Sequence, residues 1–69
     1  MKQRLSYYDI RFGDTYEIHI DDNGEFESAY RFPDRIGYCP IIYDSINEIP
    51  TFHRRAIEEL LAKNHIKYD

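Results

Sequence analysis

The chain has 69 residues, which is enough for one domain but too few to bury a large core. Its one cysteine excludes an internal disulfide, and neither a CxxC nor an HExxH metal-binding spacing occurs. The formal net charge of −4 is concentrated in residues 1–30, whose acidic excess argues against nucleic-acid binding because it repels phosphate.

Neither a secretory signal nor a membrane span is expected in this sequence. No segment approaches the roughly 18 apolar residues of a membrane span, and the N-terminus lacks the apolar run of a secretory signal. The single thiol, Cys39, suits a reducing compartment and is expected to be half-buried in a loop. We therefore expect a cytoplasmic protein, in the cell that makes it or in an infected host, with no membrane partner.

Three segments with alternating apolar residues predict antiparallel strands near residues 5–12, 16–21 and 25–32. Their common buried face is expected to consist of large apolar residues: Tyr8, Ile10, Phe12, Tyr16, Ile18, Ile20, Phe26, Tyr30 and Phe32. Pro33 ends the third strand, and a proline beside residues 41–43 fits a short edge strand there.

The first turn can be argued from register, because residues opposite one another in an antiparallel pair share a face. A three-residue loop at 13–15 sets Ile10 opposite Ile18, whereas a two-residue loop sets Ile10 opposite Glu17. Since register follows the buried face, the three-residue loop is preferred.

The second turn is argued in the same way. A three-residue loop at 22–24 sets Ile20 opposite Phe26 and puts Gly24 at the position that needs a left-handed backbone. The same register sets Ser28 opposite Ile18 and Tyr30 opposite Tyr16.

One amphipathic helix is expected from Pro50, which fits the first helical position. At 100° per residue its apolar residues form one stripe: Ile49, Phe52, His53, Ala56, Ile57, Leu60 and Leu61. Asn64 is expected as a left-handed C-terminal residue, with Ile66 folding back. Residues 1–69 thus predict a single α+β domain: a three- or four-stranded antiparallel sheet (β-meander) with one C-terminal amphipathic helix packed on one face.

The second face of this sheet is left open and is the best candidate for a functional surface. Its expected acidic residues outnumber its arginines, and such a patch steers basic partners, while tyrosines supply aromatic anchors. The predicted protein-binding residues are Tyr7, Asp9, Glu17, His19, Asp21, Glu25, Glu27, Tyr38 and Tyr43. The simpler interpretation is the solvated face of any half-exposed sheet.

Three arrangements that could carry chemistry also have simpler interpretations. Residues 21–25 resemble part of a calcium loop but lack the other EF-hand ligands, so a turn is expected. His53 is expected to bond a strand carbonyl or a tyrosine, with a pH-sensitive contact as the alternative. Carboxylates on a flat solvated face have no cleft to raise a pKa. We therefore expect no enzyme activity, no metal and no cofactor.

These features predict a small non-enzymatic protein-binding module. It would dock the acidic sheet face, the loop 33–48, or both, on a basic surface of a larger protein, including a surface that normally binds nucleic acid. In size, acidity and tyrosine content the chain resembles small phage-encoded inhibitors such as anti-CRISPR proteins. That resemblance implies an inhibitor of host machinery.

Two alternatives stay open. Three strands followed by a helix is similar in order to DNA-binding domains of the integrase-arm and AP2 type, which implies Arg11 and Arg31 on DNA, but the acidic excess opposes this. RNA-binding sheets need two or three exposed aromatic residues, and only Tyr7 is expected on the open face. An exposed edge strand could instead pair with a second copy, which predicts a homodimer or a larger homo-oligomer.

Overall fold

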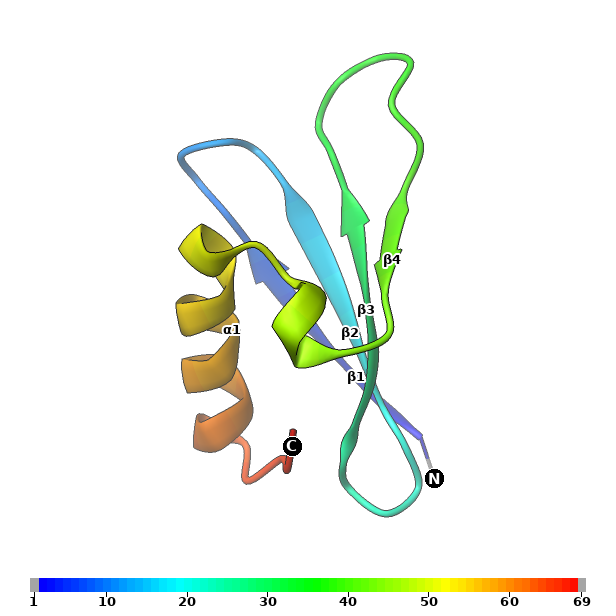
Figure 1. Ribbon diagram of the computed structural model, residues 1–69, viewed down its shortest axis with the longest axis vertical. Coiled ribbons are helices and arrows are strands. Elements are labelled where there is room, and N and C mark those ends of the chain that lie inside the picture. Colours follow the sequence, from blue (N-terminus) through cyan, green and yellow to red (C-terminus); the bar gives the residue numbers. More distant parts are fainter. Residues whose placement is uncertain (1, 69) are drawn as a thin grey trace.

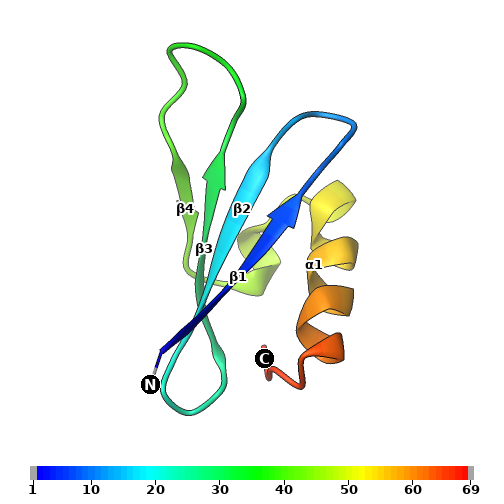
Figure 2. The ribbon, with the colours of Figure 1, turned by 180° about the vertical axis from the view of Figure 1, so that it is seen from behind.

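The computed structural model describes residues 2–68 of the chain. The elements follow in the order β1 (Gln3–Tyr8), β2 (Thr15–Ile20), β3 (Phe26–Phe32), β4 (Ile41–Tyr43), the 3₁₀ helix η1 (Ile46–Glu48) and α1 (Thr51–Lys63). The strands form one antiparallel sheet in the order β1-β2-β3-β4. Figures 1 and 2 show α1 and η1 on the same side of this sheet. The predicted α+β meander with one C-terminal helix is therefore confirmed, with β4 as its fourth strand.

β2 supplies the centre of the hydrophobic core. Its inward residues Tyr16, Ile18 and Ile20 are fully buried and alternate with more exposed residues, as a half-buried strand requires. They pack with residues from β3, η1, the connection from η1 to α1, α1 and the C-terminal segment: Ala29, Ile46, Ile49, Ile57, Leu61 and Ile66. The prediction that these three residues of β2 face the core is therefore confirmed. Across residues 2–68, no helix is both long enough and apolar enough to cross a membrane.

The first hairpin differs from its predicted register. Leu5, and not Ile10, lies opposite Ile18, so the pairing of β1 is displaced by five residues. Because five is odd, the two faces of β1 are exchanged. Leu5 and Tyr7 pack against the core, and Tyr8 lies exposed on the open face. The placement of Tyr8 inside and Tyr7 outside was wrong.

The β1–β2 loop is also longer than predicted. β1 ends at Tyr8 and β2 begins at Thr15, so residues 9–14 form the loop instead of residues 13–15. Ile10 and Phe12, predicted to be buried strand residues, lie on this loop and are exposed.

The second hairpin has the predicted three-residue turn. Ile20 lies opposite Phe26, and Gly24 has a φ of 79°, which glycine adopts without strain. The Asp21 carboxylate accepts hydrogen bonds of 2.9 Å from the backbone N–H groups of Asn23 and Glu25. The turn interpretation of this acidic segment is confirmed.

Beyond this turn the register of β3 changes at a β-bulge. His19 lies opposite Ser28, which leaves Glu27 without an opposite residue. As a result Ala29, and not Ser28, lies opposite Ile18.

The bulge reverses the two faces of the rest of β3. Ala29 and Arg31, predicted outside, lie on the helix side, and Arg31 rather than Tyr30 lies opposite Tyr16. Tyr30 and Phe32, predicted inside, lie on the open face.

α1 presents the predicted apolar stripe in part. His53, Ile57 and Leu61 are buried, whereas Phe52, predicted to face the core, is exposed. Pro50 is the residue before the helix rather than its first residue. The left-handed residue after the helix is His65, with a φ of 60°, and not the predicted Asn64. Ile66 folds back as predicted, because it is buried and its N–H donates to the Leu61 carbonyl.

Candidate functional site

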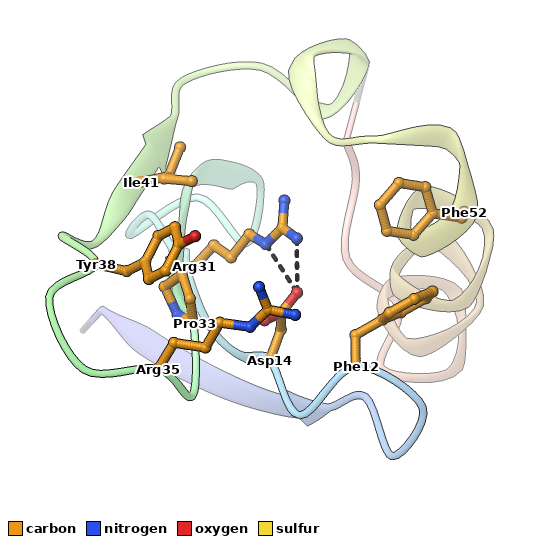
Figure 3. A pocket seen from close by; sticks show the side chains of 8 residues that line it. All are labelled: Phe12, Asp14, Arg31, Pro33, Arg35, Tyr38, Ile41 and Phe52. Atoms are coloured by element: carbon orange, nitrogen blue, oxygen red, sulfur yellow. Dashed lines mark hydrogen bonds and ion pairs between the residues drawn. The ribbon is translucent and has the colours of Figure 1, made fainter.

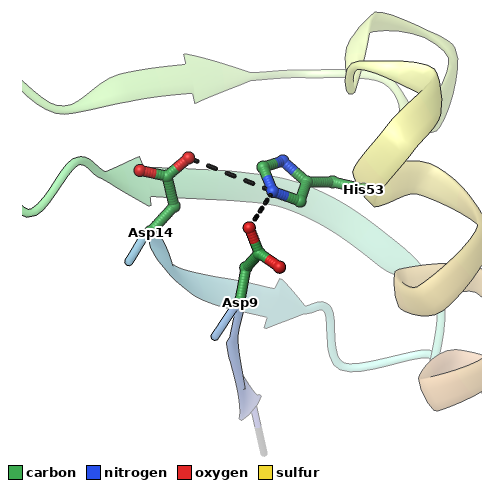
Figure 4. Close-up of side chains that lie close together, drawn as sticks. All are labelled: Asp9, Asp14 and His53. Carbon is green, nitrogen blue, oxygen red and sulfur yellow. Dashed lines mark hydrogen bonds and ion pairs between the residues drawn. The ribbon is translucent and has the colours of Figure 1, made fainter. Parts of the chain in front are cut away.

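His53 connects the start of α1 to the β1–β2 loop. Its imidazole is fully buried, and its Nε2 atom lies 2.9 Å from Oδ2 of Asp9 (Figure 4). Its Nδ1 atom lies 2.7 Å from the hydroxyl of Tyr16. The predicted tyrosine partner is therefore confirmed, whereas the aspartate partner was not predicted.

The protonation states of this group follow from its surroundings. The hydrogen bond from His53 holds the pKa of Asp9 below its usual value, although burial acts in the opposite direction. Burial raises the pKa of Tyr16. Asp9 is therefore a carboxylate that accepts the Nε2–H of His53, and Tyr16 is a neutral phenol. In the neutral imidazole, Nδ1 then accepts a hydrogen bond from the Tyr16 hydroxyl.

A second polar group lies beside the first. Nε and Nη2 of Arg31 donate to Oδ2 of Asp14 at 3.0 and 2.6 Å (Figure 3), and Nη1 donates to the Tyr43 hydroxyl at 3.3 Å. Burial opposes the charge of Arg31, but the hydrogen bonds to Tyr43 and Asp14 outweigh it and raise the pKa of Arg31. Arg31 is therefore a fixed cation whose position is set by two partners.

Asp9, Asp14 and His53 together offer three buried ligand atoms within 4.8 Å of one another, a spacing that could hold a metal ion (Figure 4). Two features oppose this use. The Arg31 guanidinium already contacts the nearer oxygen of Asp14 at 2.6 Å, and the His53 nitrogen that faces both carboxylates carries the proton shared with Asp9. The cluster is therefore best described as a charge-paired network that holds the fold.

The β1–β2 loop is held in one conformation by its first residue. The Asp9 N–H donates to the Asp14 carbonyl, and the Gly13 N–H donates to the Asp9 carbonyl, both at 2.8 Å. The Phe12 N–H donates to the Asp9 carboxylate at 3.1 Å. Gly13 has a φ of 75°, and a Cβ added there would lie 3.3 Å from Cβ of Asp34 on the β3–β4 loop. The two loops therefore pack against each other.

The β1–β2 loop (residues 9–14), the β3–β4 loop (residues 33–40), and the neighbouring ends of β4 and α1 meet at one end of the molecule, which we call the loop end. Figure 3 shows the cleft that they enclose, of about 230 Å³, lined by Phe12, Asp14, Arg31, Pro33, Arg35, Tyr38, Ile41 and Phe52. Six of the nine exposed large hydrophobic residues in the described chain belong to the loop end: Ile10, Phe12, Ile36, Tyr38, Ile41 and Phe52.

Aromatic rings and guanidinium groups of the loop end contact one another. The rings of Phe12 and Phe52 meet edge to face, with centroids 5.5 Å apart. The Arg31 guanidinium lies 5.9 Å from the Phe52 ring, and the Arg35 guanidinium lies 5.9 Å from the Tyr38 ring. The loop end is therefore an aromatic and cationic surface with a cleft at its centre.

The open sheet face is more aromatic than predicted. Tyr8, Thr15 and Phe32 lie side by side in one row across three strands. The rings of Tyr30 and Phe32 stack with centroids 6.5 Å apart, and the His19 ring lies 4.6 Å from that of Tyr30. These aromatic residues face outward because of the bulge in β3 and the displaced pairing of β1.

The open face is also less acidic than predicted. Glu17 lies 2.8 Å from Nε2 of His19 and 3.5 Å from Nη1 of Arg4. Glu27, at the bulge, lies 3.4 Å from Nζ of Lys2. The charges of both glutamates are therefore partly compensated within the sheet.

The nine predicted binding residues do not share one face. Tyr7 packs against the core and Asp9 is buried beside His53, so their placement on the open face was wrong. Glu17 and His19 lie on the open face as predicted, because they alternate with the buried residues of β2.

The other predicted binding residues are spread over two ends of the molecule. Asp21, Glu25 and Glu27 lie at the β2–β3 turn and the adjacent bulge. Tyr38 is exposed at the loop end, where Tyr43 supports Arg31.

Cys39, predicted to be half-buried, is an exposed thiol on the β3–β4 loop.

Comparison with known protein families, curated proteins and solved structures gives no match to this chain. Its function must therefore be inferred from its own geometry.

Proposed function

We propose that the protein is a small non-enzymatic protein-binding module that docks through its loop end. The observation that carries this proposal is the concentration of exposed apolar side chains there. Ile10 is 85% exposed and Ile36 is completely exposed, although both are large aliphatic residues. Monomeric proteins rarely expose contiguous apolar surface without an interaction that covers it.

The chemistry of the loop end matches that of protein interfaces. Interface residues that contribute most of the binding free energy are enriched in tyrosine and arginine and lie in well-packed clusters. Tyr38 and Arg35 lie together on the β3–β4 loop, and Arg35 makes no ion pair with another residue in the range 2–68. Arg35 and Tyr38 are therefore the first candidates for energetically important contacts.

The loop end is also preorganised. Asp9 and His53 fix the β1–β2 loop against α1, and Asp14 and Arg31 fix it against β3. A surface that is ordered before binding loses less conformational entropy in the complex, so more of its contact energy appears as affinity.

The cleft favours a side chain over a free small molecule. Its volume of about 230 Å³ lies below the roughly 300–1,000 Å³ of small-molecule sites. Aromatic walls from Phe12, Tyr38 and Phe52 surround two guanidinium groups. A single projecting residue of a partner protein fits this cleft.

An inhibitory role, in which the protein occupies a basic and nucleic-acid-binding surface of a larger protein, is a finer version of the same proposal. It is supported by the net charge of −4 and by the exposed Glu25 and Glu27 near the β2–β3 turn. These acids lie away from the loop end, so they would add electrostatic steering to a contact made mainly elsewhere.

The proposal can be tested by quantitative affinity capture from the cells in which the protein acts. Ile36→Asp and Tyr38→Ala change exposed side chains outside the core. We expect Tyr38→Ala to weaken a specific partner by about 30-fold, the loss typical of a residue that contributes about 2 kcal/mol. The matched control, Glu25→Lys with Glu27→Lys, should retain that partner.

The reverse result would reject this assignment. Partners that survive both loop-end substitutions and disappear with the two lysines would instead place the interface at Glu25 and Glu27, which were predicted to belong to an acidic sheet face.

Single-stranded nucleic acid is a second candidate ligand, because Tyr8, Tyr30 and Phe32 lie on one open sheet face. Stacking of bases on such residues is the mode of RNA-binding sheets. The net charge of −4 opposes it. Titration of labelled oligo(dT) and oligo(U) with the protein at low salt, followed by fluorescence anisotropy, tests whether the protein binds single strands. A Kd tighter than about 100 μM that is lost in Tyr30→Ala would favour this candidate.

A further inference from the structure

β1 is an edge strand of six residues, and the only charged one among them is Arg4. It pairs only with β2, and its six residues contain neither proline nor glycine (Figure 2 shows it beside α1). The other edge strand, β4, has only three residues and follows Pro40 directly. Short edges and adjacent prolines discourage pairing with further strands. β1 is therefore the edge open to extension.

The unpaired backbone groups of β1 can be assigned. The Asp9 N–H donates to the Asp14 carbonyl, so this opposing pair is a hydrogen-bonded one. Hydrogen-bonded and non-hydrogen-bonded pairs alternate along antiparallel strands. The N–H and C=O groups of Arg4, Ser6 and Tyr8 therefore point away from β2. In the described chain none of them forms a backbone hydrogen bond with another element.

A groove of about 690 Å³ runs between β1 and α1, beside this edge. It is lined by Tyr7, Ala56, Glu59, Leu60, Ala62 and Lys63. Tyr7 and Leu60 are only partly buried, although both pack on the hydrophobic core. A strand added to β1 would bring side chains to this groove.

We propose that the occupant is a second copy of the chain, whose β1 pairs antiparallel with β1 about a two-fold axis at Ser6. This register places Ser6 opposite Ser6 of the second copy and uses all three sets of unpaired backbone groups. It sets Leu5 opposite Tyr7 of the second copy on the helix side, so that apolar residues meet next to the groove. It sets Arg4 opposite Tyr8 on the open face.

Charge complementarity supports the second copy over a foreign strand. The groove rim of each copy carries one acid, Glu59, and one base, Lys63. A two-fold axis through the sheet makes the two α1 helices antiparallel. Glu59 on the groove rim of one copy therefore faces Lys63 on the groove rim of the other copy. Arg4 opposite Tyr8 adds a cation near an aromatic face on both sides of the axis. The same strand therefore complements itself on both faces of the sheet.

The first test is the molar mass of the intact chain by light scattering after size exclusion, over a concentration series. We expect the mass to rise toward twice the monomer value as the concentration increases. Ser6→Lys is a selective variant, because Ser6 lies opposite Glu17 within the monomer, where lysine finds an acidic neighbour. In the dimer two lysines would face each other, and we expect the dimer Kd to rise about fivefold or more.

Thr15→Lys is the matched control. Thr15 is exposed on the same open face but belongs to the central strand β2. Thr15→Lys adds the same charge away from the edge strand. Its molar mass should therefore rise with concentration as that of the wild type does. Melting curves of both variants at low concentration confirm that the monomers are folded.

Amide hydrogen exchange provides a second, independent measurement. The amides of Arg4, Ser6 and Tyr8 should become protected as the concentration rises, whereas those of Ile41 and Ile42 in β4 should not. A chain that stays monomeric at millimolar concentration overturns the proposal and leaves the edge to a strand from another protein. A dimer that Ser6→Lys leaves intact, or that protects β4, also overturns it.

Discussion

The imidazole Nε2 of His53 lies 2.9 Å from a carboxylate oxygen of Asp9, although the two residues are 44 positions apart in the chain. This contact ties α1 to the residue at which β1 ends. Because the Asp9 carboxylate also accepts the Phe12 N–H, the same contact determines where the β1–β2 loop places its exposed side chains. The orientation of the loop end therefore depends on a buried polar pair.

Replacing His53 by phenylalanine should destabilise the fold more than its change in volume suggests. The substitution leaves the Tyr16 hydroxyl without its partner, and an unsatisfied buried group costs about 1–3 kcal/mol. Tyr16→Phe removes one hydrogen bond and should cost about 0.5–1.5 kcal/mol. Urea unfolding of the two variants and of the double variant checks this. If the double variant lost the sum of the two single effects, the two side chains would not be coupled.

The pH dependence of stability should reflect Asp9. Its pKa in the folded chain lies below the ordinary value of 3.8, because His53 donates a hydrogen bond to it. The unfolded chain therefore takes up this proton at a higher pH than the folded chain does. The stability that Asp9 contributes is complete above about pH 4 and is lost as the pH falls through the folded pKa.

The measurement is the free energy of unfolding of wild type and Asp9→Asn across that range. The difference between them should shrink as the pH falls. Glu25→Gln, at an exposed position, provides the control for the background effect of the other carboxyl groups. A difference that stays constant down to about pH 2 would show that Asp9 has the same pKa in both states.

Two glycines allow the contact between the loops to be measured. Gly13 and Gly24 both have a positive φ, so alanine at either position costs about 1–2 kcal/mol in backbone strain. Only at Gly13 would the new Cβ also crowd another residue, 3.3 Å from Cβ of Asp34. Thermal unfolding should therefore show a larger loss for Gly13→Ala than for Gly24→Ala. Equal losses would mean that the two loops can move apart freely.

Metal addition should leave the wild-type melting temperature unchanged. The arginine on Asp14 and the shared proton of His53 occupy the positions that a cation would need. Arg31→Gln removes the competing guanidinium and leaves only the His53 proton for zinc to displace, so millimolar zinc should then stabilise the variant through Asp9, Asp14 and His53. Zinc stabilisation of the wild type would show instead that the network opens to bind a metal.

The parts of the fold that follow local rules could be predicted from the sequence. The buried face of β2 could be read from its alternation, because Tyr16, Ile18 and Ile20 are separated by polar residues. The second turn could be predicted because Gly24 occupies the position that requires a left-handed backbone. α1 could be placed from its apolar stripe.

The face of β1 could not be predicted, because two overlapping patterns compete. Leu5 and Tyr7 offer one apolar face, and Tyr8 and Ile10 offer the other. The contact of Asp9 with His53 favours the face with Leu5 and Tyr7, because it places Asp9 in the loop after β1. A pair so distant in sequence has no local signature.

The open face was mispredicted for a related reason. The bulge at Glu27 turns the following residues of β3 over, so Tyr30 and Phe32 lie outside. Bulges depend on how the sheet twists against its neighbours, and nothing in the residue pattern from 25 to 32 indicates one. The candidate site consequently moved from the acidic open face to the loop end. Of the predicted residues, Asp9 and Tyr38 belong to it, and Tyr43 supports Arg31 beside it.

The most direct test of the docking surface is site-specific photocrosslinking in the cells where the protein acts. A benzophenone amino acid is placed at Tyr38 in one variant and at Glu25 in another. Both residues are exposed, and the β3–β4 loop and the β2–β3 turn that carry them lie at opposite ends of the sheet (Figure 1). Docking through the loop end predicts a crosslinked band of one discrete larger mass from position 38 and none from position 25. Crosslinking from position 25 alone would contradict it.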